Sequence, residues 1–144
     1  MRLLVVANET VTGRALIEAV ERRKNGDLRV TVISPVNQPE RSLVVYEDTR
    51  RAAAGRRLDR TLTMLRDEGI PAHGIVVETD PVTAVRDALA QLEPPVDEII
   101  VSTFAPSRSP WMRKNLVQRL HDETKLPVEH VVFQPDEVKG EVPA

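Results

Sequence analysis

The sequence contains no cysteine, few aromatic residues and no long uninterrupted hydrophobic segment. Without cysteine the chain can form no disulfide, zinc-thiolate site or iron–sulfur cluster, and it has no thiol nucleophile. Aromatic residues make up only 3% and the net charge is −2, which argues against nucleic acid as a partner. Charged residues interrupt every apolar run before the roughly 18 residues that a membrane-spanning helix needs. The run at residues 3–7 is too short for an export signal, so we expect a cytoplasmic protein without membrane contact.

The composition is that of a soluble protein with a substantial core. The chain has 144 residues and 16.1 kDa, with 41% hydrophobic and 29% charged residues. This length suits one domain, which we expect over residues 1–133. Residues 134–144 are polar and include Pro135, Gly140 and Pro143, so we expect a flexible tail there.

Five short apolar runs, rich in valine and isoleucine, predict strands that are buried on both faces. They span residues 3–7, 28–33, 75–77, 99–101 and 131–133. Unbroken apolar runs of this kind are typical of parallel sheets.

Apolar residues at helical spacing separate these runs. We expect helices over residues 12–24 and 49–68, one that begins at Asp80-Pro81, and a last helix that begins at Ser109-Pro110. Met112, Leu116 and Leu120 would form the inner face of the last helix. Strict alternation predicts an α/β fold of three layers, α/β/α, with a five-stranded parallel sheet. Residues 35–48 lie outside this pattern, and within them residues 43–46 form either a minor strand or a lid.

Open parallel sheets bind ligands beyond the carboxyl ends of their strands, where the strand order reverses. The segment after the fourth strand is the richest in polar groups and leads into a helix, whose N-terminus favours a phosphate or carboxylate. The candidate ligand-binding residues are Asn8, Ser102, Thr103, Ser107, Arg108, Ser109 and Arg113. In the alternative interpretation, Ser109 only caps the helix and the arginines are solvated.

Four short segments point to a known family. They are Arg14-Ala15-Leu16, Asp80-Pro81, Val96-Asp97-Glu98-Ile99-Ile100-Val101-Ser102 and Leu126-Pro127-Val128, each at a corresponding place in the order of elements. Over about residues 2–133 the chain resembles the universal stress protein (UspA-like) superfamily. The resemblance implies a Rossmann-like fold of the HUP superfamily, with strand order 3-2-1-4-5 and a role in the stress response.

The loop that binds ATP in that family is not matched. Its ATP-binding members carry glycine, two residues, glycine, nine residues, then glycine with Ser or Thr. Here Ser102 stands in place of the first glycine, Pro106 intrudes and Lys114-Asn115 replaces the closing pair. Proline has no amide hydrogen to donate to a phosphate. The acidic residue expected after the first strand is also missing, since Ala7 or Asn8 stands there. The resemblance therefore implies a member of the ATP-independent branch, with a degenerate nucleotide-binding loop and no expected cofactor, while a nucleotide or other small anion stays open as a ligand.

Other chemistry is weakly supported. The three histidines, His73, His121 and His130, share no metal-ligand spacing, and no Gly-x-Ser-x-Gly turn for a nucleophile is present. The arginines between residues 50 and 60 are interspersed with acids, which is typical of a solvated helix face. Trp111 either packs under the loop or lies at its mouth as a stacking surface.

Three hypotheses follow. The first is a non-catalytic domain that binds a ligand or partner; the second is a protein that binds ATP, AMP or cyclic AMP, or a slow ATPase; the third is a structural dimerisation module. If the strand order is that of the family, the strand from Val128 to Phe133 lies at a sheet edge and would pair with its own copy in a homodimer. Glu129 and His130 are the residues that would instead guard this edge.

Overall fold

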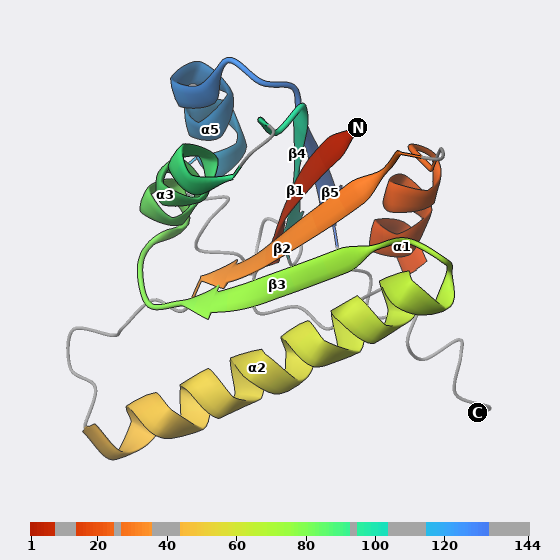
Figure 1. The fold of residues 1–144 in the computed structure, drawn as a ribbon. Helices are drawn as coiled ribbons and strands as arrows, with labels where there is room; N and C mark the ends of the chain where they lie inside the picture. Colours follow the sequence, from red (N-terminus) through yellow and green to blue (C-terminus); the bar gives the residue numbers. More distant parts are fainter. Residues whose placement is uncertain (8–13, 25–26, 36–43, 93–94, 104–114, 133–144) are drawn as a thin grey trace.

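The computed structural model describes residues 1–7, 14–24, 27–35, 44–92, 95–103 and 115–132. Strands and helices alternate along these residues (Figure 1). The elements are β1 (Arg2–Ala7), α1 (Arg14–Glu21), β2 (Arg29–Pro35), α2 (Val44–Asp67), β3 (Ala72–Val77), α3 (Pro81–Gln91), β4 (Glu98–Thr103), α5 (Leu116–Thr124) and β5 (Val128–Val132).

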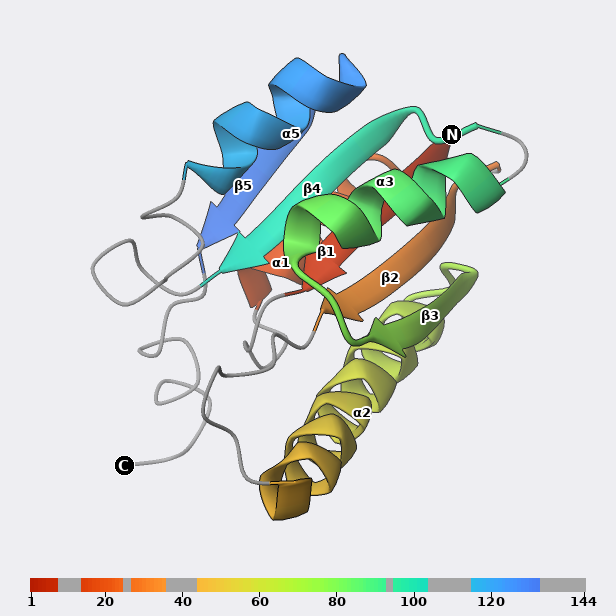
Figure 2. The ribbon, with the colours of Figure 1, turned by 90° about the vertical axis from the view of Figure 1, so that its left-hand side faces the viewer.

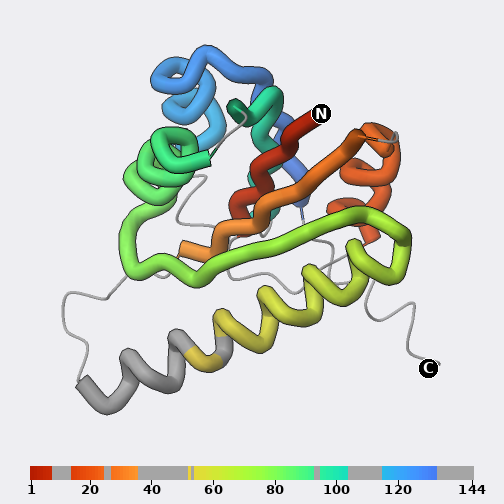
Figure 3. Tube along the Cα trace, in the orientation of Figure 1, coloured from red at the N-terminus to blue at the C-terminus, as the bar shows by residue number. Residues whose placement is uncertain are grey.

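The five strands form one parallel sheet in the order β3-β2-β1-β4-β5, which Figure 2 shows from the side of α3 and α5. The predicted strand order is therefore confirmed. β1 is the central strand, β3 and β5 are the edges, and the chain enters the sheet at its middle (Figure 3). The candidate tail at residues 134–144 lies outside the described residues.

The helices cover the sheet on both faces, with α1 and α2 on one side and α3 and α5 on the other (Figure 1). Alternate residues of β1 enter two separate cores: Leu3 and Val5 pack on the side of α1 and α2, whereas Leu4 and Val6 pack on the side of α3 and α5. All four are essentially inaccessible to solvent. This two-sided burial explains the unbroken apolar run of β1, whereas the edge strands β3 and β5 are only partly buried, so the prediction of burial on both faces is wrong for them.

The predicted start of α3 and the predicted end of α2 are confirmed. Asp80 accepts hydrogen bonds from the backbone N–H of Thr83 at 2.9 Å and from its hydroxyl at 2.8 Å, and Pro81 occupies the first turn. Gly69 follows α2 with φ +78°, a left-handed conformation that glycine adopts without strain.

Two expectations about the helices are wrong. Helix α2 begins at Val44, so residues 44–46 do not form a minor strand. No glycine or proline lies between Val44 and Gly55, and a helix once nucleated extends through such a segment. A single last helix from Ser109 onward is also excluded, because Asn115 is left-handed with φ 54° and α5 starts after it. Leu116 and Leu120 are buried, as expected, while Met112 lies outside the described residues.

An ion-pair network connects the end of α1 to strands β4 and β5. Arg23, just after α1, donates to both carboxylate oxygens of Glu98, from Nε at 2.9 Å and from Nη2 at 2.5 Å, and also to Glu129 on β5. Glu129 accepts a second bond, of 2.8 Å, from Arg22.

In the described part of the chain, no helix has the length and apolarity needed to cross a bilayer.

Candidate functional site

The carboxyl ends of β1 and β4 lie side by side at the centre of the sheet, with Ala7 opposite Ser102. The helix that follows β1, α1, packs on one face, whereas α5, which follows β4, packs on the other. The order of strands therefore reverses between β1 and β4. This is the position at which open parallel sheets leave a crevice for a ligand.

Two hydroxyl groups end β4 at this position. Ser102 is 3% exposed and Thr103 is fully buried, although both are polar. Strand alternation directs Ser102 to the side of Ile100 and the α1 core, and Thr103 to the side of Val101 and the α5 core. Buried hydroxyls need hydrogen-bond partners, so both are fixed parts of the structure at this end of β4.

Thr103 is linked to the neighbouring edge strand through a histidine. Its Oγ1 lies 2.6 Å from Nε2 of His130 on β5, and the parallel register places His130 opposite Val101. Burial lowers the pKa of His130 below its ordinary value, which favours a neutral ring at physiological pH. A neutral ring either accepts from or donates to the threonine hydroxyl, depending on its tautomer.

Of the predicted site residues, the structure brings Ser102 and Thr103 to the β1–β4 junction. Asn8, Ser107, Arg108, Ser109 and Arg113 lie outside the described residues, as does Trp111. The sequence reasoning did not assign His130 to the site. The parallel pairing of the fourth and fifth strands would have indicated it, because that register puts residue 130 near residues 101–103.

The other two histidines have local structural partners. His73 Nε2 lies 3.1 Å from the hydroxyl of Thr31, and His121 Nδ1 lies 3.0 Å from the carbonyl oxygen of Leu126. Among the residues that the structure describes, no group of three or more histidines and acids is arranged to hold a metal ion.

The topology and the two-sided helix layers define a three-layer α/β/α protein of the doubly wound class. Solved universal stress proteins share this architecture over nearly the whole chain. The structure is similar to that of a universal stress protein family member from Burkholderia pseudomallei, with TM-score 0.64, 17% identity, and coverage of 91% of this chain and 96% of the other. It is also similar to the universal stress protein from Archaeoglobus fulgidus in complex with dAMP, with TM-score 0.64, 17% identity, and coverage of 91% and 98%.

A third similar structure comes from a plant. It is a universal stress protein family protein from Arabidopsis thaliana with AMP bound, with TM-score 0.61, 16% identity, and coverage of 100% of this chain and 97% of the other. No protein-family model matches the sequence, and no curated protein matches it at a significant level. The chain therefore has the universal stress protein fold that the sequence resemblance implied.

Proposed function

We propose that this chain is a universal-stress-protein-like, cytoplasmic binding protein that holds a small anionic ligand without catalysing a reaction. The observation that carries this proposal is the reversal of strand order between β1 and β4, with the hydroxyls of Ser102 and Thr103 built into the end of β4. In this proposal Asn8 and the polar residues that follow Thr103 in the chain supply the remaining contacts. These residues are Ser107, Arg108, Ser109 and Arg113.

The chemistry of the proposed site favours recognition over catalysis. Hydroxyls and arginine donate hydrogen bonds to an anion, and guanidinium groups match phosphate or carboxylate in a bidentate manner. Neither group is a ready nucleophile or base. Thr103 is also held by His130, which orients its hydroxyl within the sheet.

A nucleotide is the second candidate, because two solved structures of the same fold are complexes with dAMP and AMP. For this chain we favour a nucleoside monophosphate over ATP. The family's triphosphate loop depends on glycine amides, whereas this sequence has Ser102 and Pro106 in that segment.

Titration calorimetry with AMP, cyclic AMP and ATP tests the ligand class. We expect AMP to bind more tightly than ATP, and Arg108→Ala to weaken binding at least about tenfold, since a hydrogen bond to a charged group contributes about 1.5–3 kcal/mol. Arg119→Ala is the matched control, because Arg119 is an exposed arginine on α5. Binding that is unchanged in both Arg108→Ala and Thr103→Val would place the ligand elsewhere and overturn the proposed site.

Two further measurements separate the remaining hypotheses. Phosphate release from ATP would favour the slow ATPase, whereas absence of heat with all three nucleotides and with inorganic phosphate would favour a structural dimerisation module.

We also propose a homodimer through the edge strand from Val128 to Phe133. Gel filtration with multi-angle scattering would contradict the dimer by giving a monomer mass at micromolar concentration.

A further inference from the structure

Two arginines lie directly opposite each other at the amino end of the sheet. Arg2 on β1 and Arg29 on β2 are register partners, so their side chains project from the same face of the sheet. The two strands that carry them lie about 4.8 Å apart. In the described part of the chain, neither guanidinium has a carboxylate partner; the side chain of Asp97 instead accepts the backbone N–H of Arg2 at 2.8 Å. Like charges opposite each other on neighbouring strands are destabilising unless something of opposite charge bridges them.

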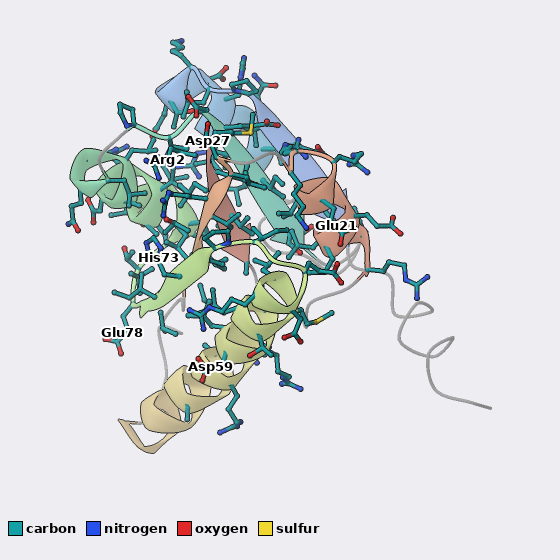
Figure 4. The ribbon with its side chains drawn as sticks, turned by 45° about the vertical axis from the view of Figure 1, so that its right-hand side comes forward. Arg2, Glu21, Asp27, Asp59, His73 and Glu78 are labelled. Carbon is teal, nitrogen blue, oxygen red and sulfur yellow. The ribbon has the colours of Figure 1, made fainter. Side chains whose placement is uncertain are left out.

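These arginines face the side of the sheet on which α3 lies. Strand alternation puts Arg2 on the same face as Leu4 and Val6, which pack in the α3 and α5 core. Figure 4 shows the labelled Arg2 and His73 on this side, and Glu21 of α1 on the other. The next residues of this face toward the carboxyl ends include Thr31 on β2 and His73 on β3, which are register partners. The Thr31 hydroxyl lies 3.1 Å from Nε2 of His73, so both side chains add polar groups near the two arginines.

The arginine pair opens into an apolar groove. A hollow of about 310 Å³ contains Arg2 and Arg29 in its wall, and it adjoins a hollow of about 470 Å³ with which it shares Thr31, His73 and Leu92. The larger hollow lies between α3 and strands β2 and β3. Its aliphatic lining residues are Ile33, Ile75, Val77, Ala84, Ala88 and Leu92.

The floor of this groove is an uncovered part of the sheet. Ile75, on edge strand β3, is 56% exposed and faces the α3 side, whereas its neighbour Gly74 faces α2 and lies against Leu58. From His73 to Val77 the floor extends about 13 Å at the rise of an extended strand. The two hollows together have the volume of a small-molecule site.

The lining selects the kind of ligand. Among the described lining residues of the two hollows, the only aromatic ring is the imidazole of His73, and the apolar side chains are aliphatic. Among the described lining residues, Asp87 is the one carboxylate, and it belongs to the larger hollow and not to the arginine end. This polarity orients an elongated ligand with its anionic group at Arg2 and Arg29 and its aliphatic part toward Val77.

We infer that this groove is a binding site for an aliphatic acid, whose carboxylate bridges Arg2 and Arg29 and whose alkyl chain lies along β2 and β3 beneath α3. The guanidinium forks match a carboxylate bidentately, and an anion there neutralises two adjacent positive charges. The alkyl chain covers the exposed surface of Ile75. The arginine end of this site lies at the amino ends of β1 and β2, whereas the proposed anion site lies at the carboxyl ends of β1 and β4.

Decanoate, used below its micelle concentration, is the probe. Titration calorimetry should show one decanoate site per chain. Decanol should bind at least about tenfold more weakly because it lacks the carboxylate, and acetate should not bind measurably because it lacks the alkyl chain. Arg29→Ala should weaken decanoate binding at least about tenfold, whereas Arg119→Ala, an exposed arginine on α5, should leave it within twofold. Equal affinity for decanoate and decanol would refute the role of the arginine pair.

A second pair of variants tests the apolar floor. Ile75→Asp should abolish decanoate binding, and Met64→Asp, which changes another exposed apolar side chain, should not. Circular dichroism is the control for whether both variants are folded. Failure of the wild-type protein to bind decanoate, or binding that survives both Arg29→Ala and Ile75→Asp, overturns the inference. AMP titration of Arg29→Ala keeps the two sites distinct, because the proposed anion site should be unaffected.

Discussion

Replacing Arg23 should destabilise the protein more than its position near the surface suggests. Its guanidinium is 14% exposed and forms a two-point contact with Glu98, which is 16% exposed, and a further contact with Glu129. Hydrogen bonding to Glu98, followed by that to Glu129, raises the pKa of Arg23 above its ordinary value. The Arg23→Ala variant would therefore leave the largely buried Glu98 without its cation and Glu129 with Arg22 alone.

The expected loss lies between two known limits. Exposed ion pairs contribute about 0–1 kcal/mol, and removal of one partner from a fully buried pair costs about 3–5 kcal/mol. Because Glu129 is 32% exposed and keeps Arg22 as a partner, we expect about 2–3 kcal/mol for Arg23→Ala, or about 5–10 °C in Tm.

Urea unfolding followed by circular dichroism measures this loss, and Arg86→Ala is the control. Arg86 pairs with Glu123 at a similar distance of 2.9 Å, but the two side chains are 65% and 41% exposed, so less than about 1 kcal/mol should be lost. The double variant Arg23→Met with Glu98→Gln should lose less than the sum of the single changes, since it removes the unpaired charge as well. Equal losses in Arg23→Ala and Arg86→Ala would refute the view that this network fastens α1 to β4 and β5.

Three other perturbations have definite signs. Gly74→Ala should lower the free energy of unfolding by about 1–3 kcal/mol, because its Cβ would lie 2.7 Å from the carbonyl oxygen of Val32, whereas Gly55→Ala, with no atom within 4 Å, should raise it by up to about 1 kcal/mol; chemical denaturation compares them. Asp80→Ala should lower the free energy of unfolding by about 1 kcal/mol near neutral pH. Hydrogen bonding from the backbone N–H of Thr83 lowers the pKa of Asp80 below 3.8, so the difference from wild type should vanish as acid protonates this carboxylate. Denaturant titrations at stepped pH measure the difference. Burial lowers the pKa of His130 below 6.5, so the unfolded chain takes up the proton first and stability should fall as pH decreases from 6.5 toward the lowered pKa; His130→Gln should remove this slope, and a slope that persists would assign it to another group.

The sequence was informative where structure depends on local pattern. The apolar runs located all five strands, and Asp80-Pro81 located the start of α3, because a cap and a proline act on their own helix. The strand order came from the family resemblance and not from periodicity. The start of α2 was missed because the β-branched residues near Val44 favour strands locally, while helix propagation prevails in the fold.

What could not be predicted depends on register between strands. The contact of Thr103 with His130 and the opposition of Arg2 and Arg29 each join residues 27 positions apart, and nothing in either local segment specifies the partner. The hollow beside Ile75 likewise depends on where α3 lies across the sheet. For the candidate anion site, the sequence placed Ser102 and Thr103 in the segment after the fourth strand, whereas in the structure they are the last two residues of β4 and are buried.

The central place of β1 has a consequence for how the protein is made. Among the five strands, this one leaves the ribosome first, yet its second neighbour, β4, follows about 95 residues later. Until then, a nascent half-sheet of β3, β2 and β1 would present an apolar border with unsatisfied amide and carbonyl groups, the kind of border that recruits other chains. Translation speed and chaperone supply should therefore influence the yield of this protein more strongly than the stability of its finished form would suggest.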